Sequence, residues 1–229
     1  MSIVSIHQPN YFPWLGYFYK IVNSDVFVFL DNVQFSKNSY INRVQIYGKD
    51  EKVRWLTVPV SVHLGQLIEE VHPSSIDWRS KHLDSLFNHY SYANNFKHVW
   101  PDIQEIFSAI DPYDSVSQIN SMIIIKISNF LGIHSDFRYS SQLNTKGVGE
   151  ERLISSVSCV SPNGTYLSGI GGKEYQDPKS FTNAGLGFQY VNFSHPYYHQ
   201  WSPSFQSGLS ILDPIFHLGW KKTSALLVI

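Results

Sequence analysis

The first thirty residues predict a strand, a helix and a second strand. Residues 3–6 are a short run rich in β-branched side chains, and apolar residues recur at helical spacing over 15–22 after a Pro-rich turn. Residues 26–30 are continuously apolar, as in a strand buried on both faces of a parallel sheet. The right-handed crossover of such a βαβ unit brings both carboxyl strand ends to one edge, where open α/β sheets bind ligands. We therefore expect His7 and Asp31 at that edge.

The rest of the pattern predicts a hairpin, a helical segment and further strands. A β-hairpin is expected from residues 44–47 and 55–60 around the turn-forming residues 48–50. Helices are expected at 78–90, 100–109, 116–131 and 150–159, with Pro101 as a helix boundary, and strands at 137–139, 165–167 and 188–193. The predicted fold is α/β: a mostly parallel sheet with a Rossmann-like βαβ start and a helical segment in the middle. We expect one domain over residues 1–229, with the helical lobe at about 74–132.

Composition and charge narrow the class of protein. Charged residues make up only 15% of the chain, and 17 Lys and Arg against 18 Asp and Glu give a net charge of −1. Nucleic-acid binding draws on a basic excess that this chain lacks, so nucleic acid is not an expected partner. The N-terminus has no signal-peptide pattern, and no apolar run approaches the roughly 20 residues of a membrane span. We expect a cytoplasmic protein without a membrane span, and leave its oligomeric state open.

Cysteine usage also restricts the chemistry. Cys159 is the one cysteine, so no disulfide can form within the chain, which fits a reducing compartment. It lies in an apolar helical stretch, and we expect it in the core rather than as a nucleophile. No Cys/His cluster has zinc-ligand spacing, and we expect neither a metal nor a cofactor.

Two polar clusters follow the first two predicted strands. The alternatives are a Pro-stiffened loop whose His7 simply bonds a neighbouring carbonyl, and a solvated face after Asp31. The chain has few charged residues, yet Lys and Arg are concentrated here. Because both bind phosphate, this concentration instead favours a site for a charged ligand. The candidates are His7, Gln8, Asn10 and Tyr11 in HQPNYFPWLGY, and Asp31, Gln34, Lys37, Tyr40, Asn42 and Arg43 in DNVQFSKNSYINRV.

Two further clusters lie in the last third of the chain. YLSGIGGKEY predicts a strand, a Gly-rich turn and a helix start, where backbone amides favour anions; a tight connection is the alternative. In the last cluster we expect a loop and a following helix that places Ser210 and Asp213 on one face. The candidates are Ser168, Gly169, Gly171, Lys173 and Tyr175, followed by His195, Tyr198, Gln200, Ser210 and Asp213.

At these clusters the chain resembles the WbqC-like protein family. The resemblance is carried by IHQPNYFPWLGYFYKI, DVFVFLDNVQFSKNSYINRV, WLTVPV, YLSGIGGKEY and LSILDPIFHLG, and spans nearly the whole chain. The chain departs from the family pattern at Phe216 and His217. For this reason position 217 is given no role. The resemblance implies an association with bacterial polysaccharide and O-antigen gene clusters, and a role as a glycine-type aminoacyl or other acyl transferase to a sugar.

Combined with the residues, the resemblance gives a hypothesis for an acyl transferase. His7, titrating near neutrality, would act as the base with His195 as its rival, Asp31 would orient it or bind the amine, and Lys37 with Arg43 would hold phosphate. The Gly169 to Gly172 turn would supply backbone donors for an oxyanion. The expected partners are an amino-sugar or nucleotide-sugar acceptor and an acyl or aminoacyl carrier protein as donor. All four clusters are expected in one pocket. The alternatives are a nucleotidyl-transfer-type α/β enzyme, although the His-x-Gly-His pattern is absent, and a non-catalytic carbohydrate- or carrier-binding protein.

Overall fold

The computed structural model describes residues 1–48, 50–201 and 204–228, which form two compact units. Lys49 of the expected hairpin turn lies outside the described residues. Unit 1 consists of Met1–Gln8, Gly16–Asn32 and Ile133–Ser194, and unit 2 of Pro9–Leu15, Val33–Gly132 and His195–Ile229. A single domain over the whole chain stays a prediction. In the described part of the chain, no helix is long and apolar enough to cross a bilayer.

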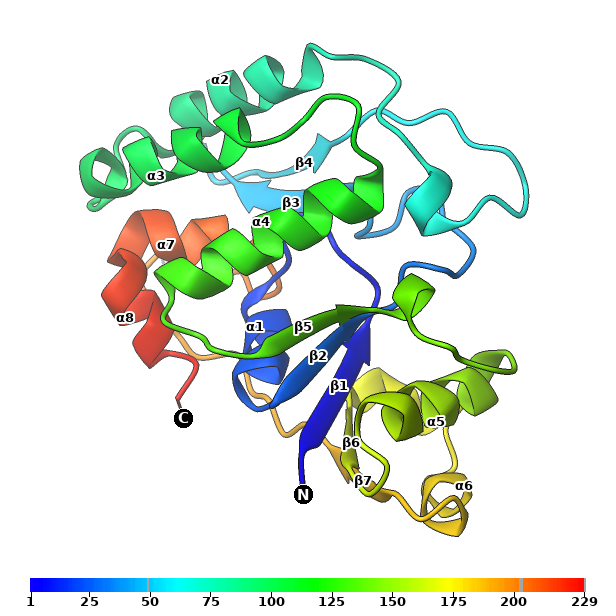
Figure 1. The fold of residues 1–229 in the computed structure, drawn as a ribbon. Coiled ribbons are helices and arrows are strands. Elements are labelled where there is room, and N and C mark those ends of the chain that lie inside the picture. The colour runs from blue at the N-terminus through cyan, green and yellow to red at the C-terminus, as the bar shows by residue number, and fades with distance from the viewer. Residues whose placement is uncertain (49, 202–203, 229) are drawn as a thin grey trace. The chain divides into compact units, whose positions relative to one another are not determined.

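Unit 1 is built on a five-stranded parallel sheet in the order β5-β2-β1-β6-β7 (Figure 1). Its strands are β1 (Ile3–His7), β2 (Val26–Phe29), β5 (Asp136–Tyr139), β6 (Thr165–Ser168) and β7 (Gly187–Tyr190). Numbered by their succession in this sheet, the strands run 3-2-1-4-5, which is the core of the Rossmann order. The predicted α/β class and the βαβ start are confirmed.

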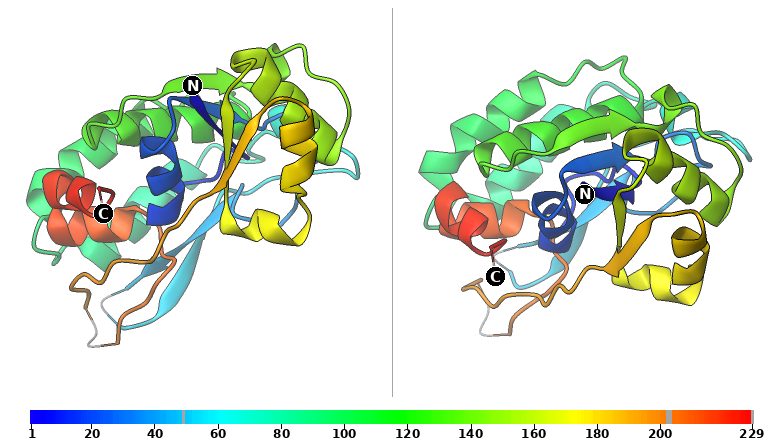
Figure 2. Two further views of the ribbon diagram at one scale, coloured as in Figure 1. Left: turned by 90° about the horizontal axis from the view of Figure 1, so that it is seen from below. Right: turned by 60° about the horizontal axis from the view of Figure 1, so that its bottom comes forward.

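Helices cover both faces of this sheet (Figure 2). One face carries α1 (Leu15–Val22), where the hydroxyl of Ser24 donates to that of Ser5 on β1. The opposite face carries α5 (Gly149–Val160) and α6 (Pro178–Asn183). The core beneath them contains Val4, Ile6, Val28, Val157, Tyr166, Phe181 and Leu186. This alternation along β1 puts Ser5 and His7 toward α1 and the apolar residues toward α5 and α6.

Unit 2 combines an antiparallel hairpin with helices (Figure 1). Its elements are β3 (Arg43–Tyr47), β4 (Val53–Thr57), α2 (Trp78–Tyr90), α3 (Phe96–Ser108), α4 (Val116–Phe130), α7 (Leu212–Leu218) and α8 (Trp220–Ala225). Stacked rings of Tyr90, Phe216 and Phe96 join α2, α7 and α3. Ser115 caps α4 by accepting a hydrogen bond from the Gln118 backbone amide. The expected helical segment is confirmed.

Several sequence expectations are wrong in detail. Pro101 lies inside α3, which begins at Phe96 instead of residue 100. Burial of Phe96 and Val99, at about 1.5–3 kcal/mol each, offsets the roughly 3 kcal/mol that an interior proline costs. β4 and β7 end at Thr57 and Tyr190, earlier than expected.

Two other expectations concern single side chains. Ser210 precedes α7 and therefore shares no helical face with Asp213. Its hydroxyl instead accepts from the Leu212 amide at 3.2 Å and donates to the Phe12 carbonyl at 2.9 Å. Cys159 is exposed rather than in the core, because α5 turns Val157 toward the sheet and Cys159 away from it.

Candidate ligand-binding edge of the parallel sheet

The carboxyl ends of β1 and β6 flank the point where the strand order of unit 1 reverses. Ligands of open α/β sheets bind in the crevice outside such a switch point. Here the two strands pair only through Ile3 with Thr165 and Val4 with Tyr166, so no pairing extends to their carboxyl ends. One side-chain bond, from the Ser5 hydroxyl to the Leu167 carbonyl at 3.3 Å, bridges the separating strands. The topology thus selects the edge formed by His7 and Ser168.

His7 lies at the carboxyl end of β1, as expected. Its Nδ1 is 3.0 Å from the Gln8 carbonyl, which can only accept, so Nδ1 carries the proton and Nε2 the lone pair. Its ring packs edge-on against Tyr17, with centroids 4.7 Å apart. Burial, and then the charge of Lys20, lower the pKa of His7 to about 4. The expectation of titration near neutrality is therefore wrong: the imidazole is neutral at pH 7, and the bond to Gln8 is the alternative that the sequence left open.

Lys20 is a buried cation next to this histidine that the sequence reasoning missed. It follows Tyr17 by one helical turn on α1, and its ammonium donates to the Ile6 carbonyl at 2.8 Å. Only 4% of the residue is exposed, and burial lowers its pKa to about 7. The signal was present, since Lys20 is the one charged residue within the apolar segment LGYFYKIV.

Asp31 lies just beyond β2 at the same edge, buried among serine donors. Its carboxylate accepts from the Ser140 hydroxyl, the Ser141 amide and the Ser141 hydroxyl at 2.9, 2.9 and 2.7 Å. These serines follow β5, so Asp31 joins the carboxyl ends of two neighbouring strands. These bonds hold the residues that follow β2 and β5 together at this edge. That Asp31 orients His7 or binds an amine stays a prediction.

The Gly-rich turn after β6 forms a short 3-10 helix, Ile170–Glu174. Ser168 is buried, and its hydroxyl donates to the Gln176 side-chain oxygen. Lys173 places its ammonium 5.3 Å from the centroid of the Tyr190 ring, and Tyr175 is largely exposed. The expected anion-binding amides of Gly169 and Gly171 remain a prediction.

Replacing Gly172 with alanine tests how firmly this turn is packed. An added Cβ would lie 2.4 Å from Ser168 Oγ and from Gln176 Oε1, the atoms of the buried hydrogen bond. We expect G172A to reduce the free energy of unfolding by about 1–3 kcal/mol in urea denaturation, as forced overpacking does. G171A is the matched control, since nothing lies within 4 Å of its added Cβ. Equal losses in both variants would contradict this account.

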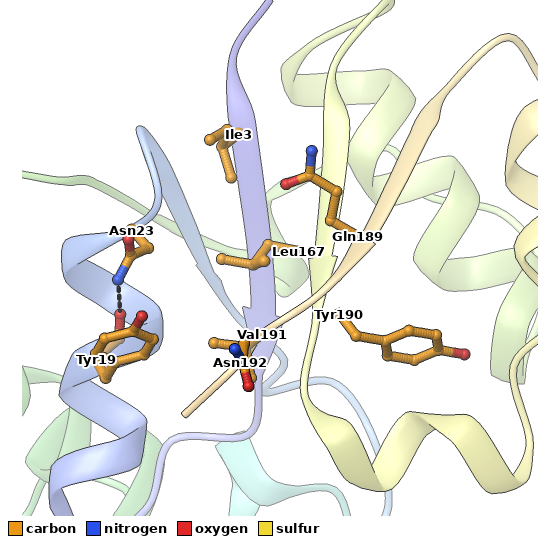
Figure 3. Close-up of a pocket in the computed structure, with 8 residues that line it drawn as sticks. All are labelled: Ile3, Tyr19, Asn23, Leu167, Gln189, Tyr190, Val191 and Asn192. Carbon is orange, nitrogen blue, oxygen red and sulfur yellow. Dashed lines mark hydrogen bonds between the residues drawn. The ribbon is translucent and has the colours of Figure 1, made fainter. Parts of the chain in front are cut away.

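A shallow cavity of about 110 Å³ lies on the α1 side of the same sheet (Figure 3). Carboxamides and phenols supply its polar groups, Ile3, Leu167 and Val191 its apolar ones, and none of its lining residues is charged. Amide and phenol groups hydrogen-bond hydroxyls without demanding a charge. The polar lining consists of Tyr19, Asn23, Gln189, Tyr190 and Asn192.

The second half of the first cluster belongs to unit 2. Tyr11 is fully buried, and its hydroxyl donates to His82 Nδ1 at 2.8 Å because His82 Nε2 must donate to the Thr57 carbonyl. Burial raises the pKa of Tyr11 well above its ordinary value. Asn10 is buried, and the neighbouring Pro9 carbonyl accepts from Asn120.

The rest of the second cluster, from Gln34 to Arg43, lies in unit 2 around β3. Asn42 is buried and donates to the Val58 carbonyl, whereas Lys37 is exposed. Gln34 forms an isolated β-bridge with Leu67. Tyr40 and Arg43 are partly exposed beside Trp55. The phosphate-holding role of Lys37 and Arg43 stays a prediction.

The last cluster forms a buried network around Asp213 of α7. This carboxylate accepts from the hydroxyls of Tyr90 and Tyr198 at 2.9 and 2.7 Å and from the Gln200 amide at 3.0 Å. Burial outweighs these bonds and raises the pKa of Asp213 to about 6. His217, one turn later, has Nε2 3.9 Å from the carboxylate. Sequence reasoning found Tyr198, Gln200 and Asp213, gave His217 no role and missed Tyr90.

His195, the rival base, is held by the backbone. Its Nε2 accepts from the Gly208 amide at 3.0 Å, so the lone pair on that nitrogen is engaged. Burial lowers the pKa of His195. Since Nδ1 of His7 carries the proton and Nε2 of His195 already accepts a backbone bond, the geometry favours His7, at a strand end, over His195 as the base.

Buried histidines of unit 2 predict an acid-sensitive stability. Burial lowers the pKa of both His82 and His217 to about 4, so between pH 4 and roughly 6.5 the unfolded chain binds their protons and stability is lost. The pKa of Asp213 is raised to about 6, so this carboxyl stabilises the fold as the pH falls, but it is one group against two histidines. We expect a lower urea midpoint at pH 5 than at pH 7. The change should shrink in His82→Gln but not in His98→Gln, an exposed control; a midpoint that is flat with pH would refute the assignment.

Comparison with known proteins identifies the family. The WbqC-like protein family matches residues 8–225. The chain belongs to this family. The chain is also similar to the uncharacterized protein Rv1507c of Mycobacterium tuberculosis, with 29% identity over 222 residues that cover 96% of this chain and 95% of that protein. No solved structure matches the chain significantly.

The WbqC-like motifs are divided between the two units. Unit 1 brings together His7, Gln8, Asp31 and the turn from Ser168 to Tyr175 on the carboxyl side of its sheet. Unit 2 holds the remaining candidates, from Asn10 and Tyr11 to Asp213. A single pocket for all four clusters stays a prediction.

Proposed function

We propose that the carboxyl edge of the unit 1 sheet binds an amino-sugar attached to a nucleotide or phosphate, and that the protein transfers an acyl or aminoacyl group to its amine. One observation carries the proposal: the separation of β1 and β6 at the switch point of a 3-2-1-4-5 parallel sheet. The family resemblance supplies the acyl-transfer chemistry and the setting in bacterial surface polysaccharide synthesis.

The residues of this edge suit such a transfer. The acceptor nitrogen attacks the carbonyl carbon of the donor, a carbon–nitrogen bond forms, and the bond to the thiol or other carrier group breaks. His7 Nε2 takes the proton released by the nitrogen and returns it to the leaving group. A pKa of about 4 leaves this nitrogen unprotonated at neutral pH, and the charge of Lys20 contributes to that lowered pKa. Lys173 at the turn after β6 supplies positive charge for phosphate.

The uncharged cavity on the α1 side supports a sugar ligand. Sugar hydroxyls need many hydrogen-bond partners and no net charge, and carboxamides provide both donors and acceptors. Asn23, Gln189 and Asn192 offer such groups beside Tyr19. A dinucleotide would instead call for the Gly-x-Gly-x-x-Gly fingerprint after β1, where this chain has HQPNYF.

Mass spectrometry tests the transfer directly. The protein is incubated with UDP-glucosamine and with either acetyl-CoA or a glycyl thioester, and the nucleotide sugar is examined for the mass gain of one acyl or glycyl group. We expect a gain with wild type and its loss with His7→Gln. Binding of the nucleotide sugar without transfer from any thioester or aminoacyl donor would favour the binding-protein alternative.

Nucleotidyl transfer is the second candidate. The strand order and an imidazole at the carboxyl end of the first strand also fit that class of α/β enzyme. The two reactions differ in products, because nucleotidyl transfer from a nucleoside triphosphate to a sugar phosphate releases pyrophosphate. Pyrophosphate release without acyl transfer would replace the first proposal by this one.

A further inference from the structure

The β3–β4 hairpin of unit 2 carries exposed aromatic rings next to an arginine. Leu56 and Val44 face the core, whereas Trp55 is 42% exposed and Tyr40 39% exposed. The Tyr40 ring lies 5.8 Å from that of Trp55 and 5.5 Å from that of Trp14, centroid to centroid. We call Trp14, Tyr40 and Trp55 the ring surface. Large rings kept partly in water on one surface are typical of a binding site.

Arg43 stacks on this ring surface, and the described part of the chain gives it no counter-ion. Its guanidinium carbon lies 4.1 Å from the centroid of the Trp55 ring, a close cation–π contact. Among the described residues Arg43 has no ion pair, and its Nε is buried without a hydrogen-bond partner. By contrast, Arg54 on the same hairpin is paired with Asp50. The buried Nε cannot meet a ligand, but the terminal N–H groups of Arg43 make no hydrogen bond among the described residues, and such groups can hold an anion through two parallel bonds.

We propose that the ring surface and Arg43 bind a sugar ring that carries a phosphate or carboxylate group. The C–H faces of a pyranose pack on aromatic rings, while the anion meets the guanidinium. The cross-strand partners Gln45, opposite Trp55, and Thr57, opposite Arg43, add hydrogen-bonding groups for hydroxyls. This deepens the proposed function by naming a docking site for an anionic saccharide, and rests on it only for the choice of a saccharide as ligand.

Binding measurements with three sugars test the proposal and separate its two anion sources. Glucose 1-phosphate, glucuronic acid and glucose are titrated into the full chain by calorimetry or ligand-observed NMR. We expect one or both anionic sugars to bind at least about ten-fold more tightly than glucose, since the charged contact is worth about 1.4 kcal/mol or more. Preference for glucose 1-phosphate identifies the phosphate source, and preference for glucuronic acid the carboxylate source. Equal affinity for all three, or no binding, would overturn the proposal.

Matched variants locate the site. Trp55→Ala and Arg43→Gln should each weaken binding of the preferred sugar by about ten-fold, and Trp55→Phe should restore much of it. Arg54→Gln and Tyr113→Ala are the controls, one a paired arginine of the same hairpin and the other an aromatic residue exposed elsewhere in unit 2. Undiminished binding by Trp55→Phe and Trp55→Ala alike would place the sugar elsewhere.

The same variants distinguish this proposal from the proposed function. If anionic sugars bind through Arg43 and Trp55 but no acyl transfer is found, the docking site stands and the transferase proposal fails. If transfer depends on His7 while Trp55→Ala keeps full affinity and full transfer, the transferase proposal stands and the docking site fails. Loss of sugar binding in the two control variants as well would also count against the docking site.

Discussion

His7→Gln is expected to slow acyl transfer by about 10²- to 10⁴-fold, the range for removal of an acid–base group. Glutamine can keep the hydrogen bond that Nδ1 donates to the Gln8 carbonyl, but it cannot take a proton as Nε2 does. The fold should persist, which circular dichroism and the urea midpoint will check. His195→Gln should cost much less, because the Gly208 amide already engages its Nε2.

The pH profile makes this prediction specific to His7. Because its pKa is lowered to about 4, activity should be flat from neutral pH down to about pH 5 and fall below that as the imidazole is protonated. Lys20→Met removes one of the two causes of the lowered pKa, so the acidic limb should move to higher pH. Full activity of His7→Gln with an unchanged acidic limb would pass the role of base to another group.

Local patterns were enough to predict the βαβ start of the unit 1 sheet. The continuous apolar run ending near Asp31 and the helix before it define a crossover whose handedness and strand-end placement are fixed by chirality. The local apolar pattern could not predict which strands pair with one another. The pairing of β1 with β6, which creates the switch point, joins residues more than 160 positions apart in the sequence.

The errors have a common physical origin in burial that lies outside the local window. Pro101 reads as a helix boundary, yet Phe96 and Val99 gain enough from burial to continue the helix before it. The sequence analysis assigned nothing to Lys20, because only the fold brings its ammonium to the Ile6 carbonyl of β1. His7 was correctly placed at the strand end, but its lowered pKa depends on neighbours that only the fold supplies.

Asp213→Ala is expected to be the most destabilising substitution of unit 2. The hydroxyls of Tyr90 and Tyr198 and the Gln200 amide would lose a shared acceptor in a site where neither tyrosine is open to water. A buried donor left without an acceptor costs about 1–3 kcal/mol, so we expect a loss of about 3–5 kcal/mol from the three together. Urea denaturation at pH 7 measures the loss, and Asp84→Ala, at an exposed position of α2, should stay within about 0.5 kcal/mol of wild type.

Asp213→Asn separates the carboxylate's charge from its shape. Since the folded pKa of about 6 lies above the unfolded value, the folded protein binds the proton more tightly, and wild-type Asp213 contributes most below about pH 4 and progressively less up to about pH 6. The asparagine variant cannot titrate, so its deficit relative to wild type should be larger at pH 4.5 than at pH 7. A deficit that grows with pH would mean that the network prefers the ionised carboxylate. In that event the hydrogen bonds from Tyr90, Tyr198 and Gln200 outweigh the burial of the charge, and Asp213 is a permanent anion at the start of α7.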